Sequence, residues 1–210
     1  RTDSRVLTTI RIYFRFSWTR ETTKSQHVPG GRAKRYNRAV TNTEAVILIG
    51  HGGTAIDTPK PMIAELKRLE SERQARRDAV MSPREAELDK IVREWPRTPA
   101  TDPYKAGVEE IAKALAPKLG GRRLVVAYNE FCAPSVEDAI EGLVEDGMTR
   151  ISMVSTMYTR GGLHAECEIP GIVAAASKRH PGVVIEYAWP YDAGFIADFL
   201  VGQLHARRAP

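Results

Sequence analysis

The chain has 210 residues and is 42% hydrophobic, which is enough for one domain with a substantial apolar core. Its apolar runs are all shorter than the ~20 residues that a membrane-spanning helix needs. Its two cysteines, Cys132 and Cys167, lack the paired spacing of a zinc knuckle, and they favour a reducing compartment such as the cytoplasm.

The formal net charge of +5 is unevenly distributed along the chain. Basic residues strongly outnumber acidic ones within residues 1–40, so the remainder of the chain has a net negative charge. This balance does not favour nucleic-acid binding by the domain itself. Residues 1–43 lack the compact apolar core of a secretory signal, although an Arg-rich, acid-poor start also fits an organelle transit peptide. We expect a basic, poorly ordered extension there.

From residue 44 onward, short apolar runs alternate with segments of helical periodicity. Strands are predicted at residues 45–49, 123–128, 150–155 and 183–188. Helices are predicted at residues 62–77, 82–95, 104–119, 134–146, 164–178 and 193–205, and Pro170 is expected to shorten or kink the fifth of them. The alternation predicts an α/β domain with a parallel four-stranded sheet and helices on both faces.

Two charged helices interrupt this alternation after the first strand. Ser82, Pro83 and Glu85 form a helix start signal, with residues suited to the N-cap, N1 and N3 positions. The pattern predicts a helical hairpin, inserted at about residues 62–99 of a domain that spans residues 44–206. A solvated surface excursion fits the charged composition, and so does a lid or a dimer arm.

Polar side chains follow the predicted strands directly. In an open α/β sheet, ligands bind outside the carboxyl ends of the strands. His51 follows the first strand, Glu130 the second and His164 the third. Two imidazoles and a carboxylate suit a divalent metal such as Co²⁺, Fe²⁺, Ni²⁺ or Zn²⁺, and they also suit general acid and base chemistry. Structural roles fit the same residues: a helix cap for Glu130, an exposed helix start for His164 and a tight turn around His51.

The same loops contain further candidates for a binding site. They are Asn129, Cys132, Thr156, Tyr158, Arg160, Gly161, Gly162, Tyr191 and Asp192. Glu168 lies one turn after His164 if that segment is helical, and therefore on the same face. Neither a GxxxxGK[ST] phosphate loop nor a GxGxxG motif is present, which argues against the commonest nucleotide-binding uses of such a sheet.

Three segments together resemble the sirohydrochlorin chelatases, the class II cobaltochelatases and ferrochelatases. They are GHG at residues 50–52, AYNEFCAPS at residues 127–135 and GGLHAECEIP at residues 161–170. The resemblance covers residues 45–204, and its third segment is the most specific. It implies a flavodoxin-like domain of the lyase class that inserts Co²⁺ or Fe²⁺ into sirohydrochlorin or a related tetrapyrrole, in cobalamin or siroheme biosynthesis. It implies no organic cofactor, and because the chain has one lobe, it implies a homodimer.

By position, the resemblance implies that His51, His164 and Glu130 are both the catalytic residues and the metal ligands. One histidine is expected to accept pyrrole protons while the other holds the metal with Glu130. Arg160 is the predicted partner of a macrocycle carboxylate, and the neighbouring Tyr158, Gly161 and Gly162 complete the predicted substrate-binding residues.

Two other functions fit the same loops. A non-catalytic carrier of metal or tetrapyrrole would use the same side chains. Histidine phosphatases also place a His-Gly pair after their first strand, but they need an arginine immediately before that histidine. Here the position is Gly50, which makes a phosphatase the weaker alternative. The long helical insertion, Asn129 and Cys132 depart from what a minimal chelatase lobe is expected to contain.

Overall fold

A computed structural model of the chain describes residues 43–78 and 80–207. The extension predicted at residues 1–43 lies outside the described residues except for Thr43. Within the described part, no helix has both the length and the apolarity that crossing a bilayer requires.

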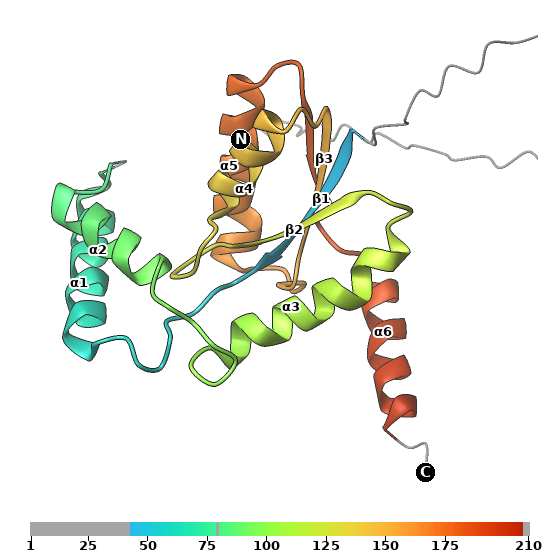
Figure 1. The fold of residues 1–210 in the computed structure, drawn as a ribbon, viewed down its shortest axis with the longest axis horizontal. Helices are drawn as coiled ribbons and strands as arrows, with labels where there is room; N and C mark the ends of the chain where they lie inside the picture. The colour runs from blue at the N-terminus through green and yellow to red at the C-terminus, as the bar shows by residue number, and fades with distance from the viewer. Residues whose placement is uncertain (1–42, 79, 208–210) are drawn as a thin grey trace, which may run out of the picture. The chain divides into compact units, whose positions relative to one another are not determined.

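The core of the domain is a four-stranded parallel sheet (Figure 1). Its strands are β1 (Glu44–Gly50), β2 (Arg123–Tyr128), β3 (Arg150–Ser155) and β4 (Val184–Tyr187). The order is β2-β1-β3-β4, which is the flavodoxin-like order of doubly wound sheets. The predicted parallel sheet is therefore confirmed. Because β1 lies between β2 and β3, the loops that follow these three strands emerge side by side at one edge.

Within the residues that the structure describes, six α-helices accompany the sheet. They are α1 (Lys60–Arg76), α2 (Pro83–Arg93), α3 (Pro103–Leu115), α4 (Val136–Glu145), α5 (Ile169–Arg179) and α6 (Ala193–Ala206), and a short 3₁₀ turn (Ala116–Lys118) follows α3. The predicted helix at residues 164–178 is divided. A π-helical turn (His164–Glu168) precedes α5 and runs directly into it, and Pro170 is the second residue of α5.

Each face of the sheet has its own apolar core. Ile47 and Ile49 of β1 pack with residues of α4 and α5, whereas Leu48 packs with Val108 and Ala112 of α3. Successive strand residues point to opposite faces, so a strand that is covered on both faces must be apolar throughout. All six residues from Ala45 to Gly50 are buried, which explains the unbroken apolar run in the sequence.

The inserted helices α1 and α2 pack against each other as a hairpin. Ser82 caps α2 in a capping box with Glu85, as its sequence predicts. Leu66, Leu88 and Val92 form a small buried core between the two helices, and Phe131 from the loop after β2 packs against it. The hairpin is therefore more than a solvated excursion, because it shares its core with a loop of the sheet edge.

Candidate metal centre

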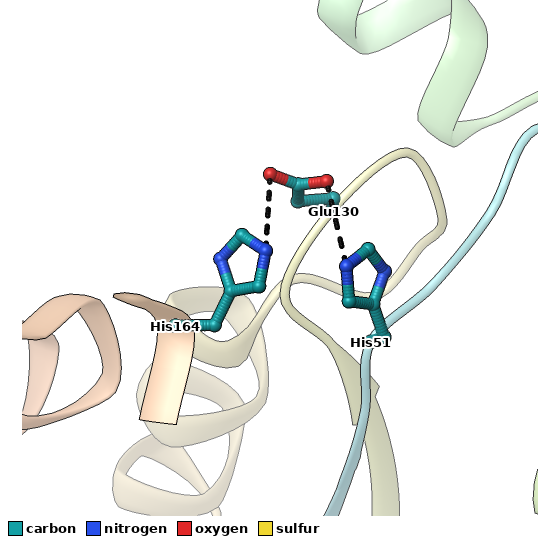
Figure 2. Close-up of side chains that lie close together, drawn as sticks. All are labelled: His51, Glu130 and His164. Atoms are coloured by element: carbon teal, nitrogen blue, oxygen red, sulfur yellow. Dashed lines mark ion pairs between the residues drawn. The ribbon is translucent and has the colours of Figure 1, made fainter. Parts of the chain in front are cut away.

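Three side chains converge at the carboxyl edge of the sheet: His51, Glu130 and His164 (Figure 2). The two oxygens of the Glu130 carboxylate face different histidines. Oε2 lies 4.0 Å from His51 Nε2, and Oε1 lies 3.7 Å from His164 Nε2. One ligand atom from each residue lies within 4.8 Å of the other two. The structure thus brings together the three side chains that the sequence proposed as ligands.

The Nδ1 atom of each imidazole, which faces away from Glu130, has a hydrogen-bond partner that fixes the orientation of the ring. His51 Nδ1 lies 2.8 Å from the carbonyl oxygen of Gly52, and His164 Nδ1 lies 2.7 Å from Glu168 Oε2. Both partners can only accept, so each Nδ1 carries the proton and donates it. Each ring then presents Nε2 toward Glu130, the atom whose lone pair can bind a metal ion. This arrangement, with Nδ1–H bound to a carbonyl or carboxylate, is typical of metal-binding histidines.

Glu168 is further held by Asn129, whose side-chain amide donates to Glu168 Oε2 at 2.8 Å. The amide nitrogen and His164 Nδ1 are 2.9 Å apart because both donate to the same oxygen. Partial burial alone would raise the pKa of Glu168, but the hydrogen bonds from His164 and Asn129 lower it below its ordinary value. Glu168 is therefore an acceptor at neutral pH. The helical spacing predicts that Glu168 lies on the face of His164, but no pattern in the sequence indicates that Asn129 joins them.

Replacing Glu168 with glutamine should weaken Co²⁺ binding by about 10- to 100-fold, the usual effect of losing a partner that orients a metal-binding histidine. A titration followed by the visible spectrum of bound Co²⁺ measures this effect. Glu166→Gln is the matched control. Glu166 is exposed and lies two residues before Glu168, so the substitution removes the same charge without touching His164. Equal weakening in both variants would mean that charge alone, and not the contact with His164, accounts for the effect.

The loops of His51 and Glu130 approach each other closely. The backbone N–H of Asn129 donates to Gly50 O at 3.0 Å, and that of Glu130 donates to His51 O at 2.9 Å. These bonds continue the pairing of β1 and β2 beyond the strands. Gly52 has a φ of +91°, and a Cβ atom built there would overlap the carbonyl oxygen of Glu130. The spacing between the two loops therefore depends on a glycine at position 52.

Replacing Gly52 with alanine should lower the free energy of unfolding by at least about 2 kcal/mol, since it adds both a strained backbone and a steric overlap. Gly53→Ala is the control, because a Cβ atom at that glycine meets nothing within 4 Å. We expect the control to stay within about 0.5 kcal/mol of the parent protein in urea denaturation. Similar stabilities of the two variants would contradict the close approach of the loops.

Tyr104, at the start of α3, contacts the His51 loop, although it was not among the candidate residues from the sequence. The backbone N–H of His51 donates to its hydroxyl at 2.8 Å, and Thr156 Oγ1 lies 3.4 Å from the same hydroxyl. Tyr104 thereby links the loops that follow β1 and β3. No local pattern in the sequence indicates this contact, because the two partners are more than fifty positions apart.

A cavity of about 530 Å³ borders Glu130 and lies between the sheet edge and the hairpin. Asn129, Glu130 and Glu168 line one side, and Glu70 and Arg73 of α1 with Arg93 of α2 line the other. Burial and the nearby charge of Glu130 raise the pKa of Glu70. Arg73 and Arg93 are paired with Glu85 and Asp89, respectively.

The predicted substrate-binding residues lie elsewhere on the domain surface. Tyr158 and Arg160 line a second cavity, of about 510 Å³, together with Tyr191 and residues of α6. Gly161 and Gly162 are exposed and connect Arg160 to the π-helical turn of His164. None of these four residues lines the cavity beside Glu130. The cationic side chains of that cavity, Arg73 and Arg93, come from the insertion, for which the sequence left a surface excursion, a lid and a dimer arm open.

Comparison with known proteins supports the resemblance drawn from the sequence. The CbiX family model matches residues 100–194, a range that includes Glu130 and His164 but not His51. The sirohydrochlorin ferrochelatase of Priestia megaterium is 30% identical over 81 residues, which are 38% of this chain and 30% of that protein. The chain therefore matches less than a third of the length of this curated relative. Both findings confirm that the chain resembles the sirohydrochlorin chelatases.

Two solved structures match part of the chain with low scores. The sirohydrochlorin chelatase SirB from Bacillus subtilis subspecies spizizenii, solved in complex with cobalt, is 19% identical, with a TM-score of 0.34 over 69% of this chain and 42% of SirB. A protein from Marinobacter aquaeolei VT8, described as a CbiX protein of cobalamin biosynthesis, is 15% identical, with a TM-score of 0.44 over 79% of this chain and 99% of that one.

Proposed function

We propose that the protein is a chelatase that inserts Co²⁺ or Fe²⁺ into sirohydrochlorin or a related tetrapyrrole. The observation that carries this proposal is the arrangement of His51, His164 and Glu130, in which two oriented Nε2 atoms face the two oxygens of one carboxylate. The similarity to a curated sirohydrochlorin ferrochelatase and to the CbiX family model supports the choice of macrocycle.

The reaction exchanges one divalent metal ion for the two N–H protons of the macrocycle. A metal ion bound by two imidazoles and one carboxylate keeps open positions for the incoming pyrrole nitrogens. As bonds to the macrocycle form, the bonds to the protein break, and the released side chains can accept the two protons. The site thus has to supply both a hold on the metal and an acceptor for the protons.

The two histidines have different surroundings, which supports a division of roles. The side chain of His51 is 41% exposed, whereas that of His164 is 23% exposed and is held by Glu168. We assign proton acceptance to His51, because an exposed ring can pass its proton on to water. We assign the longer-lasting metal contact to His164 with Glu130. The hydrogen bond from His164 Nδ1 to Glu168 keeps Nε2 of that ring pointing in one direction.

Recognition of the macrocycle is assigned to Arg160, Tyr158 and the adjacent glycines Gly161 and Gly162. The Arg160 side chain is exposed, and within residues 43–78 and 80–207 it has no ion-pair partner. An unpaired guanidinium suits one of the carboxylates on the rim of sirohydrochlorin. If it binds substrate only, Arg160→Ala raises KM for the macrocycle and leaves kcat unchanged.

We also propose that two copies of the chain pair. Helix α6 supports this proposal, because Phe195 and Phe199, which lie one turn apart on one face of the helix, are more than half exposed although they are large and apolar. Solvent-exposed apolar side chains in a contiguous group are typical of a protein interface. Light scattering during gel filtration measures the mass directly, and a monomer at all concentrations would refute the pairing.

The proposed function is tested by adding sirohydrochlorin and either Co²⁺ or Fe²⁺ to the protein and following the absorbance of the metallated product. We expect insertion above the uncatalysed rate, and its loss in both His51→Ala and His164→Ala. The faster metal would point to cobalamin or to siroheme biosynthesis. Tight binding of the macrocycle with no acceleration by either metal would instead identify a carrier, and release of phosphate from a generic ester would identify a phosphatase.

A further inference from the structure

The loop that carries Glu130 is bonded to the inserted hairpin on both sides of that residue. Arg93, the last residue of α2, donates from one terminal nitrogen to Asn129 O at 3.3 Å and from the other to Cys132 O at 3.4 Å. In return, the backbone N–H of Ala133 donates to Arg93 O at 3.1 Å. One arginine therefore spans the loop from the residue before Glu130 to the second residue after it.

A second arginine, Arg97, ties the same loop to the loop of His51. Its guanidinium donates to the carbonyl oxygen of Phe131, to Gly53 O at 2.7 Å and to Val92 O at 3.1 Å. It is also paired with Asp102, which caps the start of α3, and both side chains are only 4% exposed. A buried guanidinium with this many acceptors holds them in a fixed relative arrangement.

Phe131 shows that this loop needs external support. Its φ of +54° lies in the left-handed region, which an aromatic residue rarely adopts. Such a conformation persists only where the surroundings hold it. Here the ring packs against the hairpin core around Leu66, Leu88 and Val92, and the ammonium group of Lys67 lies 5.7 Å from the ring centre.

From these contacts we infer that the inserted hairpin is a positioning device for the metal ligands, and that Arg93 is its main positioning residue. The inference rests on the proposed function, since it assigns the hairpin a part in the same site. Arg93 acts through the backbone carbonyls of Asn129 and Cys132, which flank Glu130. Its removal frees the loop at two points, so the carboxylate no longer stays between the two imidazoles.

Arg93→Ala tests the inference, with Arg84→Ala as the matched control. Arg84 is another arginine of α2, but its bonds at 2.9 Å reach Glu65 of α1 and not the Glu130 loop. Co²⁺ is titrated into each full-length variant without macrocycle, and insertion kinetics are measured separately. We expect the affinity for Co²⁺ to fall at least about 10-fold in Arg93→Ala, with a matching fall in kcat, and to stay unchanged in Arg84→Ala.

Arg93→Lys adds a conservative variant that also covers the case in which Arg93→Ala does not fold. A lysine keeps the charge beside Asp89 but lacks the fork that spans two carbonyls, so we expect an affinity between those of the parent and the alanine variant. Parent-like Co²⁺ affinity in a folded Arg93 variant would overturn the inference, as would equal losses in the Arg84 and Arg93 variants. Failure of the parent protein to bind Co²⁺ would instead refute the proposed function.

Discussion

Replacing Glu130 with glutamine should weaken Co²⁺ binding by at least about 100-fold and abolish metal insertion. Loss of an orienting partner outside the ligand set already costs about 10- to 100-fold, and Glu130 is a proposed ligand itself. The amide removes the negative charge and turns one of the two oxygens into an N–H donor. Because each oxygen now faces an imidazole Nε2, that donor would hydrogen-bond to one of the lone pairs meant for the metal.

Calorimetric titration with Co²⁺ measures this effect, and Glu137→Gln is the control. Glu137 is an exposed acid that lines the same cavity as Glu130 without belonging to the ligand group. We expect it to bind Co²⁺ as the parent protein does. A parent-like affinity in Glu130→Gln would remove this carboxylate from the metal site and leave only the two histidines.

Replacing Arg97 with alanine should lower the free energy of unfolding by about 3–5 kcal/mol, the usual cost of removing one partner of a buried ion pair. Asp102 would remain as a buried carboxylate without its counter-charge, and the carbonyls of Gly53 and Phe131 would lose a donor. Arg123→Ala is the comparison, because the pair of Arg123 with Asp146 is half exposed on both sides.

We expect Arg123→Ala to change stability by less than about 1 kcal/mol, as exposed ion pairs do. Urea denaturation of both variants gives the two changes in the free energy of unfolding. They can be compared directly when the slope of that free energy against urea concentration is the same in both variants. Equal losses in the two variants would contradict the account of Arg97 as the buried link between the loops of His51 and Glu130.

Two features could be predicted because they depend on local patterns: the parallel sheet, and the position of the loops after β1, β2 and β3 at one end of it. A strand that is covered on both faces must be apolar throughout, and residues 45–49 show this directly. The order of strands was not needed to bring His51, Glu130 and His164 to one edge, since all parallel strands end at the same edge. That rule locates side chains near one another, but it does not give their orientations.

The contacts that orient the site could not be predicted, because they join residues far apart in the sequence. Phe131 packs into a core formed by residues of α1 and α2, and Arg97 reaches the loops after two strands. Charged helices give no sign of such partners, since a buried arginine and an exposed one look alike in a sequence. Arg160 shows that position alone is not enough. It follows β3 at the same end of the sheet as Glu130, but it lines a different cavity.

Transfer of metal from the protein to the macrocycle is the measurement that tests the central claim most directly. The protein is loaded with one equivalent of Co²⁺ and mixed with sirohydrochlorin in the presence of a chelator that captures free metal. We expect the spectrum of bound Co²⁺ to disappear as the metallated macrocycle forms, faster than from free Co²⁺, and we expect no transfer in Glu130→Gln. A macrocycle that stays metal-free while Co²⁺ remains on the protein or passes to the chelator would contradict that expectation.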